Sequence, residues 1–379
     1  MSKFCVIPWI SITSDNKGLV RPCCKFAEKD KQGEYNTPSL KDHSYADIWN
    51  GPKFQKIRQA FLDGKEIPEC SSCWNEEAAG HTSYRQTYNQ QYSHLANTES
   101  TIAEAPKVID LKLSNVCNFK CRMCDYTHSS LILKEDKKHR GYEVGDEKYY
   151  LSNKILETEN QKTFLDEWLP HMLRIEFTGG EPFVSPEAKK LIQIISETEY
   201  AKQISICIIT NGSTINKKIL DQLSKFKVVM LGLSIDDIGS RAEYQRNGTV
   251  WSDVEENIKT FSQYKNFMQN IHCTVNNYSV YGLKELLKFG KENNIKVILN
   301  ILHGPERLSV KHLSPSSKKF IENRIGDEPE LESVVKYMYS SDEDLTQDFI
   351  YETEWIDTIR KENFKDVFPE WSKVIYDSV

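Results

Sequence analysis

Three cysteines lie close together in the stretch SNVCNFKCRMCDY, residues 114–126. They are Cys117, Cys121 and Cys124, which gives the spacing C-x3-C-x2-C. In a reducing compartment, grouped thiols hold metal more often than they form disulfides. A structural zinc site would need a fourth protein ligand, for which His128 is the nearest candidate. An iron–sulfur cubane held by three cysteines instead leaves one iron open to an exogenous ligand, and the spacing alone leaves both alternatives open.

The other cysteines are unevenly placed along the chain. Five lie in the first fifth of the sequence: Cys5, Cys23, Cys24, Cys70 and Cys73. Cys207 and Cys273 lie in the apolar runs ISICIIT and IHCTV, which predict buried strands in which cysteine serves as a small hydrophobic residue. The first group is therefore a second candidate for metal binding or redox chemistry.

Length and composition set the class of protein. The chain has 379 residues, of which 39% are hydrophobic and 27% charged, which predicts two or three domains around a large α/β core. A net charge of −6 disfavours a protein that coats nucleic acid. No run of about eighteen apolar residues occurs, so we expect a soluble, unexported, cytoplasmic protein.

Strand and helix patterns alternate from about residue 107. Six strands are predicted, at 107–114, 171–178, 203–210, 227–234, 271–277 and 295–302, with helices at 186–198, 215–224, 251–266 and 281–293. Strict alternation predicts parallel pairing, in a partial (β/α)6 barrel or in a doubly wound open sheet. The strand pattern stops after residue 311, where aromatic residues at helical spacing predict a helical extension packed against the core.

Polar residues follow nearly every predicted strand. The carboxyl ends of parallel strands open on one face, which carries the active site in such folds. We therefore expect one site that uses the cysteine loop, residues 178–181, Thr210, Ser234 and Asn276. The charged, Tyr-rich stretch 127–162 is either a lid over this site or a solvated excursion.

The motifs at these strand ends resemble the radical S-adenosylmethionine (SAM) superfamily. CNFKCRMC follows the first strand, TGGEP the second and TNG the third, and SID ends the fourth with an arginine downstream. The resemblance implies a partial (β/α)6 TIM-like barrel and a [4Fe–4S] cluster on Cys117, Cys121 and Cys124 whose open iron chelates SAM. Reduction of SAM would then give a 5′-deoxyadenosyl radical that abstracts hydrogen from a substrate. The cofactor supplies this chemistry and the protein positions it.

The resemblance also implies roles for SAM-binding residues. Gly179, Gly180 and Glu181 would hold the SAM amino group, because glycine allows close backbone approach and a carboxylate accepts hydrogen bonds from ammonium. Ser234 would donate to SAM, and Arg246 would pair with its carboxylate.

Three further positions belong to the same implied site. Thr210 lies on the same face, although it could instead cap the helix that follows, and Asn276 carries the same ambiguity. Met123 stands where this superfamily usually has an apolar or aromatic residue against adenine. No residue stands out as a general base, so the catalytic residues stay unknown.

The amino-terminal cysteines resemble the SPASM module, or its shorter twitch form, which in many relatives follows the barrel. The resemblance implies one auxiliary [4Fe–4S] cluster on Cys5, Cys23, Cys70 and Cys73. A zinc site with four cysteine ligands has the same ligand count, and Cys24 could replace Cys23. We expect this module over residues 1–100, the radical SAM core over 101–310 and the helical extension over 311–379.

The predicted function is reductive SAM cleavage and hydrogen abstraction from a peptide or protein side chain. An electron donor of the flavodoxin or ferredoxin type is the expected partner, with no membrane and no nucleic acid. The alternatives are a radical SAM enzyme acting on a nucleotide or other small molecule, and a non-catalytic binding protein stabilised by zinc.

Overall fold

The computed structural model describes residues 3–27, 37–78, 82–96, 99–141 and 154–379. These residues form two compact units. Unit 1 comprises Met1–Val116, Val144–Ile208 and Asn216–Val229, and unit 2 comprises Cys117–Glu143, Ile209–Ile215 and Met230–Val379. The cysteine loop therefore belongs to unit 2, and the amino-terminal cysteines and the GGEP motif belong to unit 1.

Most strands belong to one mixed sheet with the order β10-β9-β7-β6-β5-β3-β1-β2. Its strands are β1 (Ser11–Ser14), β2 (Val20–Arg21), β3 (Val108–Lys112), β5 (Arg174–Thr178), β6 (Ser205–Thr210), β7 (Val228–Leu233), β9 (Phe267–Val275) and β10 (Lys296–Ile301). A separate antiparallel pair joins β4 (Lys120–Cys121) to β8 (Arg246–Asn247). Unit 1 holds the end of the sheet from β2 to β5, unit 2 holds β9 and β10, and β6 and β7 run from unit 1 into unit 2.

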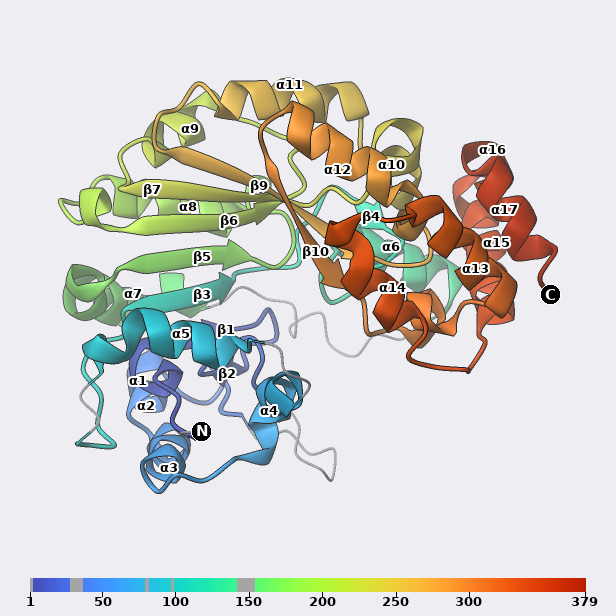
Figure 1. Cartoon of the computed structure of the whole chain (residues 1–379). Helices are drawn as coiled ribbons and strands as arrows, with labels where there is room; N and C mark the ends of the chain where they lie inside the picture. The colour runs from blue at the N-terminus through green and yellow to red at the C-terminus, as the bar shows by residue number, and fades with distance from the viewer. Residues whose placement is uncertain (1–2, 28–36, 79–81, 97–98, 142–153) are drawn as a thin grey trace. The chain divides into compact units, whose positions relative to one another are not determined.

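Six strands of this sheet follow the chain in order, from β3 through β5, β6, β7 and β9 to β10. They correspond to the six predicted strands, and helices separate them as predicted (Figure 1). A doubly wound sheet would reverse its strand order at a switch point, and this order does not. The prediction of a partial (β/α)6 barrel is therefore confirmed, and the doubly wound alternative is wrong.

Two short strands of the amino-terminal region extend this sheet and were not predicted from the sequence. Strand β1 runs parallel to β3, with Ser11 opposite Val108 and Ser14 opposite Leu111, and β2 pairs antiparallel with β1. Backbone hydrogen bonding continues beyond the strands, because Lys107 N donates to Ile10 O at 2.8 Å. The amino-terminal cysteine region thus shares a sheet edge with the first barrel strand.

The helices of unit 1 fall before β3 and between its later strands (Figure 1). They are α1 (Ile7–Ile10), α2 (Tyr45–Trp49), α3 (Pro52–Leu62), η1 (Pro68–Cys70), α4 (Ser71–Ala78), α5 (Tyr84–Tyr92), η2 (Ser93–Leu95), η4 (Lys154–Leu156), α7 (Thr158–Lys162), η5 (Thr163–Trp168), η6 (Leu169–His171), α8 (Pro186–Ser196), η7 (Ala201–Gln203) and α9 (Lys217–Leu223). Arg58 of α3 is buried and ties three segments together. Its guanidinium donates to Pro8 O at 2.9 Å, and to Trp49 O and Thr101 O at 2.8 Å each.

Unit 2 ends in the helical extension that the sequence predicts. Its helices are α6 (Ser130–His139), α10 (Gly239–Gln245), α11 (Trp251–Phe261), η8 (Ser279–Gly282), α12 (Leu283–Glu292), η9 (Glu306–Leu308), η10 (Val310–His312), α13 (Pro315–Ile325), η11 (Pro329–Leu331), α14 (Glu332–Met338), α15 (Thr346–Arg360), α16 (Phe364–Val367) and α17 (Pro369–Tyr376). Among the described residues, no helix combines the length and the apolar character needed to cross a membrane.

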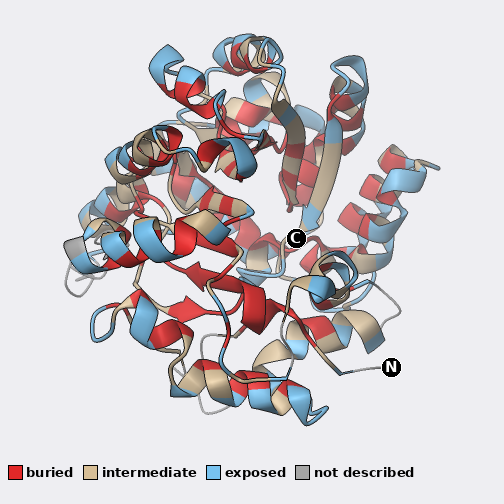
Figure 2. Ribbon diagram, turned by 90° about the vertical axis from the view of Figure 1, so that its left-hand side faces the viewer, coloured by how far each residue is buried: buried red, intermediate tan, exposed pale blue. Residues whose placement is uncertain are grey.

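The sheet residues alternate in burial. In β5, Ile175 and Phe177 are buried while Arg174, Glu176 and Thr178 are partly exposed. Strand β6 has the same alternation, and Figure 2 shows buried residues concentrated along the strands. One face of each such strand therefore builds the apolar core, and the other presents polar side chains.

Candidate functional site

Backbone pairing inside unit 2 shapes the three-cysteine loop. Cys121 lies opposite Arg246 in the pair formed by β4 and β8, and Arg122 N donates to Gln245 O at 2.9 Å. The next turn is closed by Cys124 N, which donates to Cys121 O at 3.1 Å. The β4–β8 pair therefore fixes the backbone position of Cys121, and the turn that follows sets the position of Cys124.

Arg246 links the cysteine loop to the end of β7. Its Nε donates to Asp236 Oδ2 at 2.7 Å, and its Nη1 lies 3.8 Å from Cys121 Sγ. The other oxygen of the buried Asp236 carboxylate accepts from Thr274 N at 2.7 Å. Burial raises the pKa of the Cys121 thiol, whereas the Arg246 charge lowers it. The structure thus places the Arg246 cation beside a candidate cluster ligand.

The strand ends predicted to share the site are close together in unit 2. Ser234 N donates to Thr210 O at 2.7 Å, which joins the ends of β7 and β6. Thr210 Oγ1 accepts from Gly212 N at 3.1 Å, so this hydroxyl supports its own turn. Asn276 is fully buried, and its Oδ1 accepts from Tyr278 N at 2.9 Å at the start of the next helical turn. Asn276 thus acts as the local cap that the sequence allowed.

The GGEP motif packs against the root of the cysteine loop within unit 1. Gly180 N donates to Ser114 O at 3.0 Å, and Glu181 N donates to Val116 O at 2.8 Å. A Cβ on Gly180 would lie 2.3 Å from Val116 O, so only glycine fits at this approach. Gly179 has φ = 103°, a backbone conformation that side chains disfavour. Because Val116 directly precedes Cys117, the two motifs meet at this point of the chain.

A buried arginine inside the cysteine loop is a feature that sequence reasoning missed. The guanidinium of Arg122 lies 3.6 Å from the ring centre of Tyr244 and pairs with Asp357 and Glu362, the latter at 2.6 Å. Arg360 Nη1 also donates to Lys120 O at 2.7 Å. The segment 357–362 therefore contacts the loop through these ion pairs and this hydrogen bond, and we call it the C-terminal clamp. In the sequence, the charged Arg122 between two candidate cysteine ligands was the signal that could have indicated a buried ion pair here.

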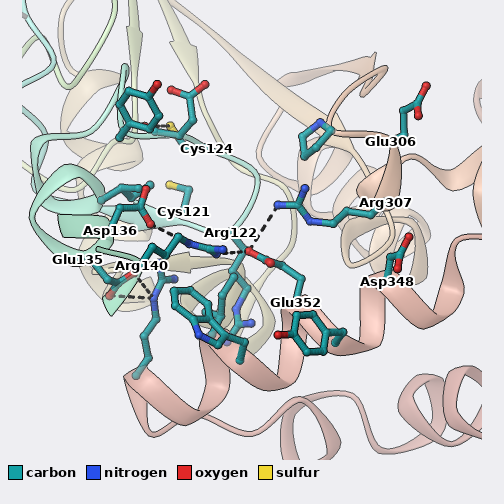
Figure 3. A pocket seen from close by; sticks show the side chains of 18 of the residues that line it. Cys121, Arg122, Cys124, Glu135, Asp136, Arg140, Glu306, Arg307, Asp348 and Glu352 are labelled. Atoms are coloured by element: carbon teal, nitrogen blue, oxygen red, sulfur yellow. Dashed lines mark hydrogen bonds and ion pairs between the residues drawn. The ribbon is translucent and has the colours of Figure 1, made fainter. Parts of the chain in front are cut away.

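A cavity of about 640 Å³ lies beside the loop within unit 2. Figure 3 shows Cys121 and Cys124 together on one part of its wall, and Glu306, Arg307 and Asp348 on another. Arg140 donates to Glu352, and its charge lies 3.7 Å from the centre of the Trp355 ring. The wall is therefore rich in ion pairs, and it places charged and aromatic groups next to two candidate cluster ligands.

Three other sequence predictions fall in or near this loop. Met123 is partly exposed. His128 Nδ1 lies 3.1 Å from Asp125 Oδ1 and 2.8 Å from Thr127 Oγ1, so this imidazole nitrogen is engaged within its own turn. The predicted lid 127–162 includes α6, but residues 142–153 lie outside the described residues and the lid stays a prediction.

Charge interactions link the amino-terminal thiols within unit 1. The pKa of Cys5 is raised to about 12, chiefly by burial and to a smaller extent by Cys73. Cys23 interacts in the same way with Cys5 and Cys70, and Cys70 with Cys5 and Cys73. Four thiols from the chain before α1, the turn after β2, η1 and α4 are therefore linked by charge interactions, although among the described residues they do not form a metal-binding group of three or more ligands. Positively charged iron would favour their deprotonation, so this donor set suits an iron–sulfur cluster.

Cys24 faces a different environment from Cys23. The charged groups that act on its thiol are chiefly Asp110, Glu176 and Lys112, on strands β3 and β5. The Cys23 thiol therefore interacts with Cys5 and Cys70 as well as with Cys24, whereas the interactions of the Cys24 thiol come chiefly from charged residues of β3 and β5.

Comparison with known proteins identifies the family. The model of the radical SAM superfamily matches residues 111–305, and that of the SPASM iron–sulfur cluster-binding domain matches residues 5–74. The radical SAM cyclopropyl synthase TigE of Paramaledivibacter caminithermalis is 25% identical over 182 residues, covering 46% of this chain and 36% of TigE. The subtilosin biosynthesis protein AlbA of Bacillus subtilis is 28% identical over 101 residues, covering 26% of this chain and 22% of AlbA.

A solved structure is also similar. That of anSMEcpe with bound AdoMet has 22% identity and a TM-score of 0.40, and the match covers 57% of this chain and 56% of that one. The chain thus spans little more than a third of TigE and about half of anSMEcpe.

The chain belongs to the radical SAM superfamily, whose model matches more than half of it. It is an enzyme that uses SAM and a [4Fe–4S] cluster, and it carries an amino-terminal SPASM domain for auxiliary iron–sulfur binding. The predicted family, enzyme class and cofactors are confirmed.

Proposed function

We propose that this enzyme holds its SAM-cleaving [4Fe–4S] cluster on Cys117, Cys121 and Cys124 and abstracts hydrogen from a peptide or protein side chain. The single observation that carries the first part is the contact of Arg246 with Cys121 Sγ, in a strand pair that joins the cysteine loop to the end of β7. When bound, the cluster and SAM supply a 5′-deoxyadenosyl radical.

The protein's own residues would bind and orient these cofactors. The segment Gly179–Glu181 would bind the SAM amino group, with the Glu181 carboxylate as its acceptor. Arg246 retains guanidinium nitrogens beyond the Nε bound by Asp236, and these suit a carboxylate. Ser234 and Thr210 come from neighbouring strand ends, and Met123 would contact the adenine.

One auxiliary [4Fe–4S] cluster on Cys5, Cys23, Cys70 and Cys73 completes the proposal. Its support is the match to the SPASM domain and the charge interactions that link these thiols in unit 1. A one-electron donor of the flavodoxin or ferredoxin type would reduce the SAM-binding cluster. The domain limits at residues 100 and 310 likewise stay proposals.

Support for a peptide substrate comes from relatives and from the cavity. AlbA is named for the biosynthesis of a bacteriocin, and it resembles this chain over 101 residues. The cavity beside Cys121 and Cys124 offers the ion-paired Arg140 and Glu352 together with Trp355, which suits a polar chain better than an apolar ligand.

The cofactor part is tested by iron and sulfide content after anaerobic reconstitution. About eight irons are expected for two cubanes, falling to about four in a Cys117/Cys121/Cys124→Ala triple variant. That variant should form no 5′-deoxyadenosine from SAM and dithionite. Zinc in place of iron, or unchanged 5′-deoxyadenosine, would contradict the assignment.

The substrate part is tested by deuterium transfer. An extract of the source organism grown in deuterated medium is separated into a protein and peptide fraction and a small-molecule fraction. Each is incubated with the reconstituted enzyme, SAM and dithionite, and deuterium in 5′-deoxyadenosine is measured by mass spectrometry. Transfer from the protein and peptide fraction is expected, and transfer from the small-molecule fraction alone would show that the substrate class is wrong.

A further inference from the structure

The cavity beside the cysteine loop is formed within unit 2, and its size suits a ligand. Its volume of about 640 Å³ falls in the range of about 300–1,000 Å³ that is usual for ligand sites. Cys121 and Cys124 lie on one part of the wall, and helix α15 supplies another (Figure 3). A group bound on the α15 side would therefore share one cavity with the candidate cluster.

The four arginines in the cavity wall already have acidic partners. Arg307 lies 3.4 Å from Glu352, which also pairs with Arg140. The other two arginines pair with Glu135 and with the C-terminal clamp. Among the described residues that line the cavity, no cation is therefore left unpaired for an anionic ligand.

Two carboxylates on the same wall have no such partner. Glu306 begins η9, and Asp348 lies in the first turn of α15. Both are exposed, and neither side chain forms an ion pair or a hydrogen bond with any residue that the structure describes. The cavity therefore carries a residual negative charge, which is complementary to a cation.

An exposed aromatic side chain stands beside one of these carboxylates. Tyr351 is 69% exposed, lines the cavity and follows Asp348 by three residues on α15, so the two side chains are neighbours on one helix face. Trp355 follows one turn later, and the charge of Arg140 lies 3.7 Å from the centre of its ring. A basic side chain can use Tyr351 in the same way, with its stem against the ring and its cation near Asp348.

The matches to the two family models do not include these groups. The radical SAM match ends at residue 305, directly before Glu306, and α15 begins at Thr346. The SPASM match ends at residue 74. The unpaired carboxylates and the exposed ring are therefore features of this chain's own carboxyl-terminal extension.

We propose that Glu306 and Asp348 bind a lysine or arginine side chain of the peptide substrate, with Tyr351 against the hydrocarbon stem of that side chain. This inference rests on the proposed function and narrows its substrate to a basic peptide. Because Cys121 and Cys124 line the same cavity, the basic residue is close in the substrate to the side chain that loses hydrogen. The three residues thus determine specificity.

The double variant Glu306→Gln/Asp348→Asn tests the two carboxylates. Both are exposed and break no ion pair with a described residue, so this variant should keep the Tm and the iron content of the wild type. The probe is the deuterated protein and peptide fraction, at a fixed amount that does not saturate the enzyme. Deuterium transfer into 5′-deoxyadenosine should fall about tenfold, since each exposed ion pair contributes up to about fivefold.

The matched control is Asp253→Asn/Glu256→Gln. It removes the same charge from exposed positions of α11 that do not line the cavity, and it should transfer deuterium at the wild-type rate. Wild-type transfer in both double variants would overturn the inference. An equal fall in both would show an effect of net charge alone and would overturn it as well.

SAM is itself a cation, so its binding is measured separately. Equilibrium dialysis should give the same Kd for SAM in the wild type and in Glu306→Gln/Asp348→Asn. A weaker Kd in this variant would assign the two carboxylates to SAM and would overturn the inference.

Chemical blocking of the probe tests the substrate cation and separates lysine from arginine. One portion of the deuterated fraction is acetylated at its amino groups, a second is treated with cyclohexanedione, which blocks guanidinium groups, and a third receives both treatments. With the wild type, transfer should fall about tenfold in one single treatment, which identifies the residue, and in the double treatment. With Glu306→Gln/Asp348→Asn, blocking should cause no further fall.

The outcomes separate this inference from the proposed function. Full transfer from the doubly treated portion to the wild type would overturn this inference alone. No transfer from the untreated portion to the wild type would overturn the proposed function and this inference with it.

Discussion

Cys121 and Arg246 lie opposite each other in the two-residue strands β4 and β8, and the Arg246 Nη1 lies 3.8 Å from the Cys121 sulfur. The same arginine is paired with the buried Asp236 at 2.7 Å. One side chain thus contacts a candidate cluster ligand and the end of a barrel strand. Its remaining donors are available to a carboxylate, which is the basis of the first prediction.

Replacing Arg246 should weaken SAM binding. Arg246→Lys keeps the positive charge but loses the planar donor pair, so the Kd for SAM should rise about tenfold or more. Equilibrium dialysis on the reconstituted protein measures this constant. The matched control is Arg241→Lys, because Arg241 pairs in the same way with the buried Asp237, outside the β4–β8 pair. Equal Kd values for both variants would argue against a SAM-binding role for Arg246.

The C-terminal clamp should stabilise the cysteine loop. The double variant Asp357→Asn/Glu362→Gln leaves the buried Arg122 without its anionic partners, at a cost of about 3–5 kcal/mol. We expect a lower Tm and faster loss of about four irons to a chelator, with the auxiliary iron retained. The exposed Glu332→Gln serves as the control. Iron loss at the wild-type rate would show that the clamp does not hold the loop.

The sequence was sufficient to predict the barrel strands because they are apolar, regularly spaced and separated by amphipathic helices. It did not reveal β1, since SITS is only four residues long, three of them polar, and its pairing with β3 is a long-range contact. The predicted helix 251–266 ends at Phe261 in the structure, and β9 begins at Phe267, before the predicted residue 271. Helix periodicity does not fix such an end, because the polar residues after Phe261 suit a turn as well.

Candidate ligands could be selected from cysteine spacing, whereas the groups that support them could not. Asp357 and Glu362 lie more than two hundred residues from Arg122, and no local pattern connects them. The pairing of Glu176 with Asp110 was also not predicted, because a carboxylate in a strand cannot be distinguished from an ordinary polar residue until its neighbours in the sheet are known. Short motifs therefore identified the candidate ligands, and the tertiary structure added the groups that contact them.

Adjacent cysteines should behave differently in the amino-terminal domain. Cys23→Ser should lose about four irons, because its thiol interacts with Cys5 and Cys70. Cys24→Ser should keep the full iron content, because the charges around Cys24 are those of Asp110 and Glu176. Iron and sulfide analysis of the two reconstituted variants makes the comparison. Iron loss in Cys24→Ser alone would reverse the assignment.

Glu176 should make the stability of the enzyme depend on pH. Its pKa is raised from 4.5 to about 7, chiefly by burial, so the folded protein binds this proton more tightly than the unfolded chain. The resulting stabilisation is present below about pH 4.5 and is lost as the pH rises through 7. It amounts to about 3 kcal/mol, since one pKa unit corresponds to about 1.4 kcal/mol.

Urea unfolding of the wild type and of Glu176→Gln, at about pH 5 and about pH 8, measures how much stability each protein loses between the two pH values. The contributions of the other titrating groups cancel when the two losses are compared. The Glu176→Gln variant should lose less stability between the two pH values than the wild type. The variant Glu199→Gln, at an exposed glutamate, is the control and should behave like the wild type. Equal losses of stability in all three proteins would mean that the Glu176 pKa is not raised.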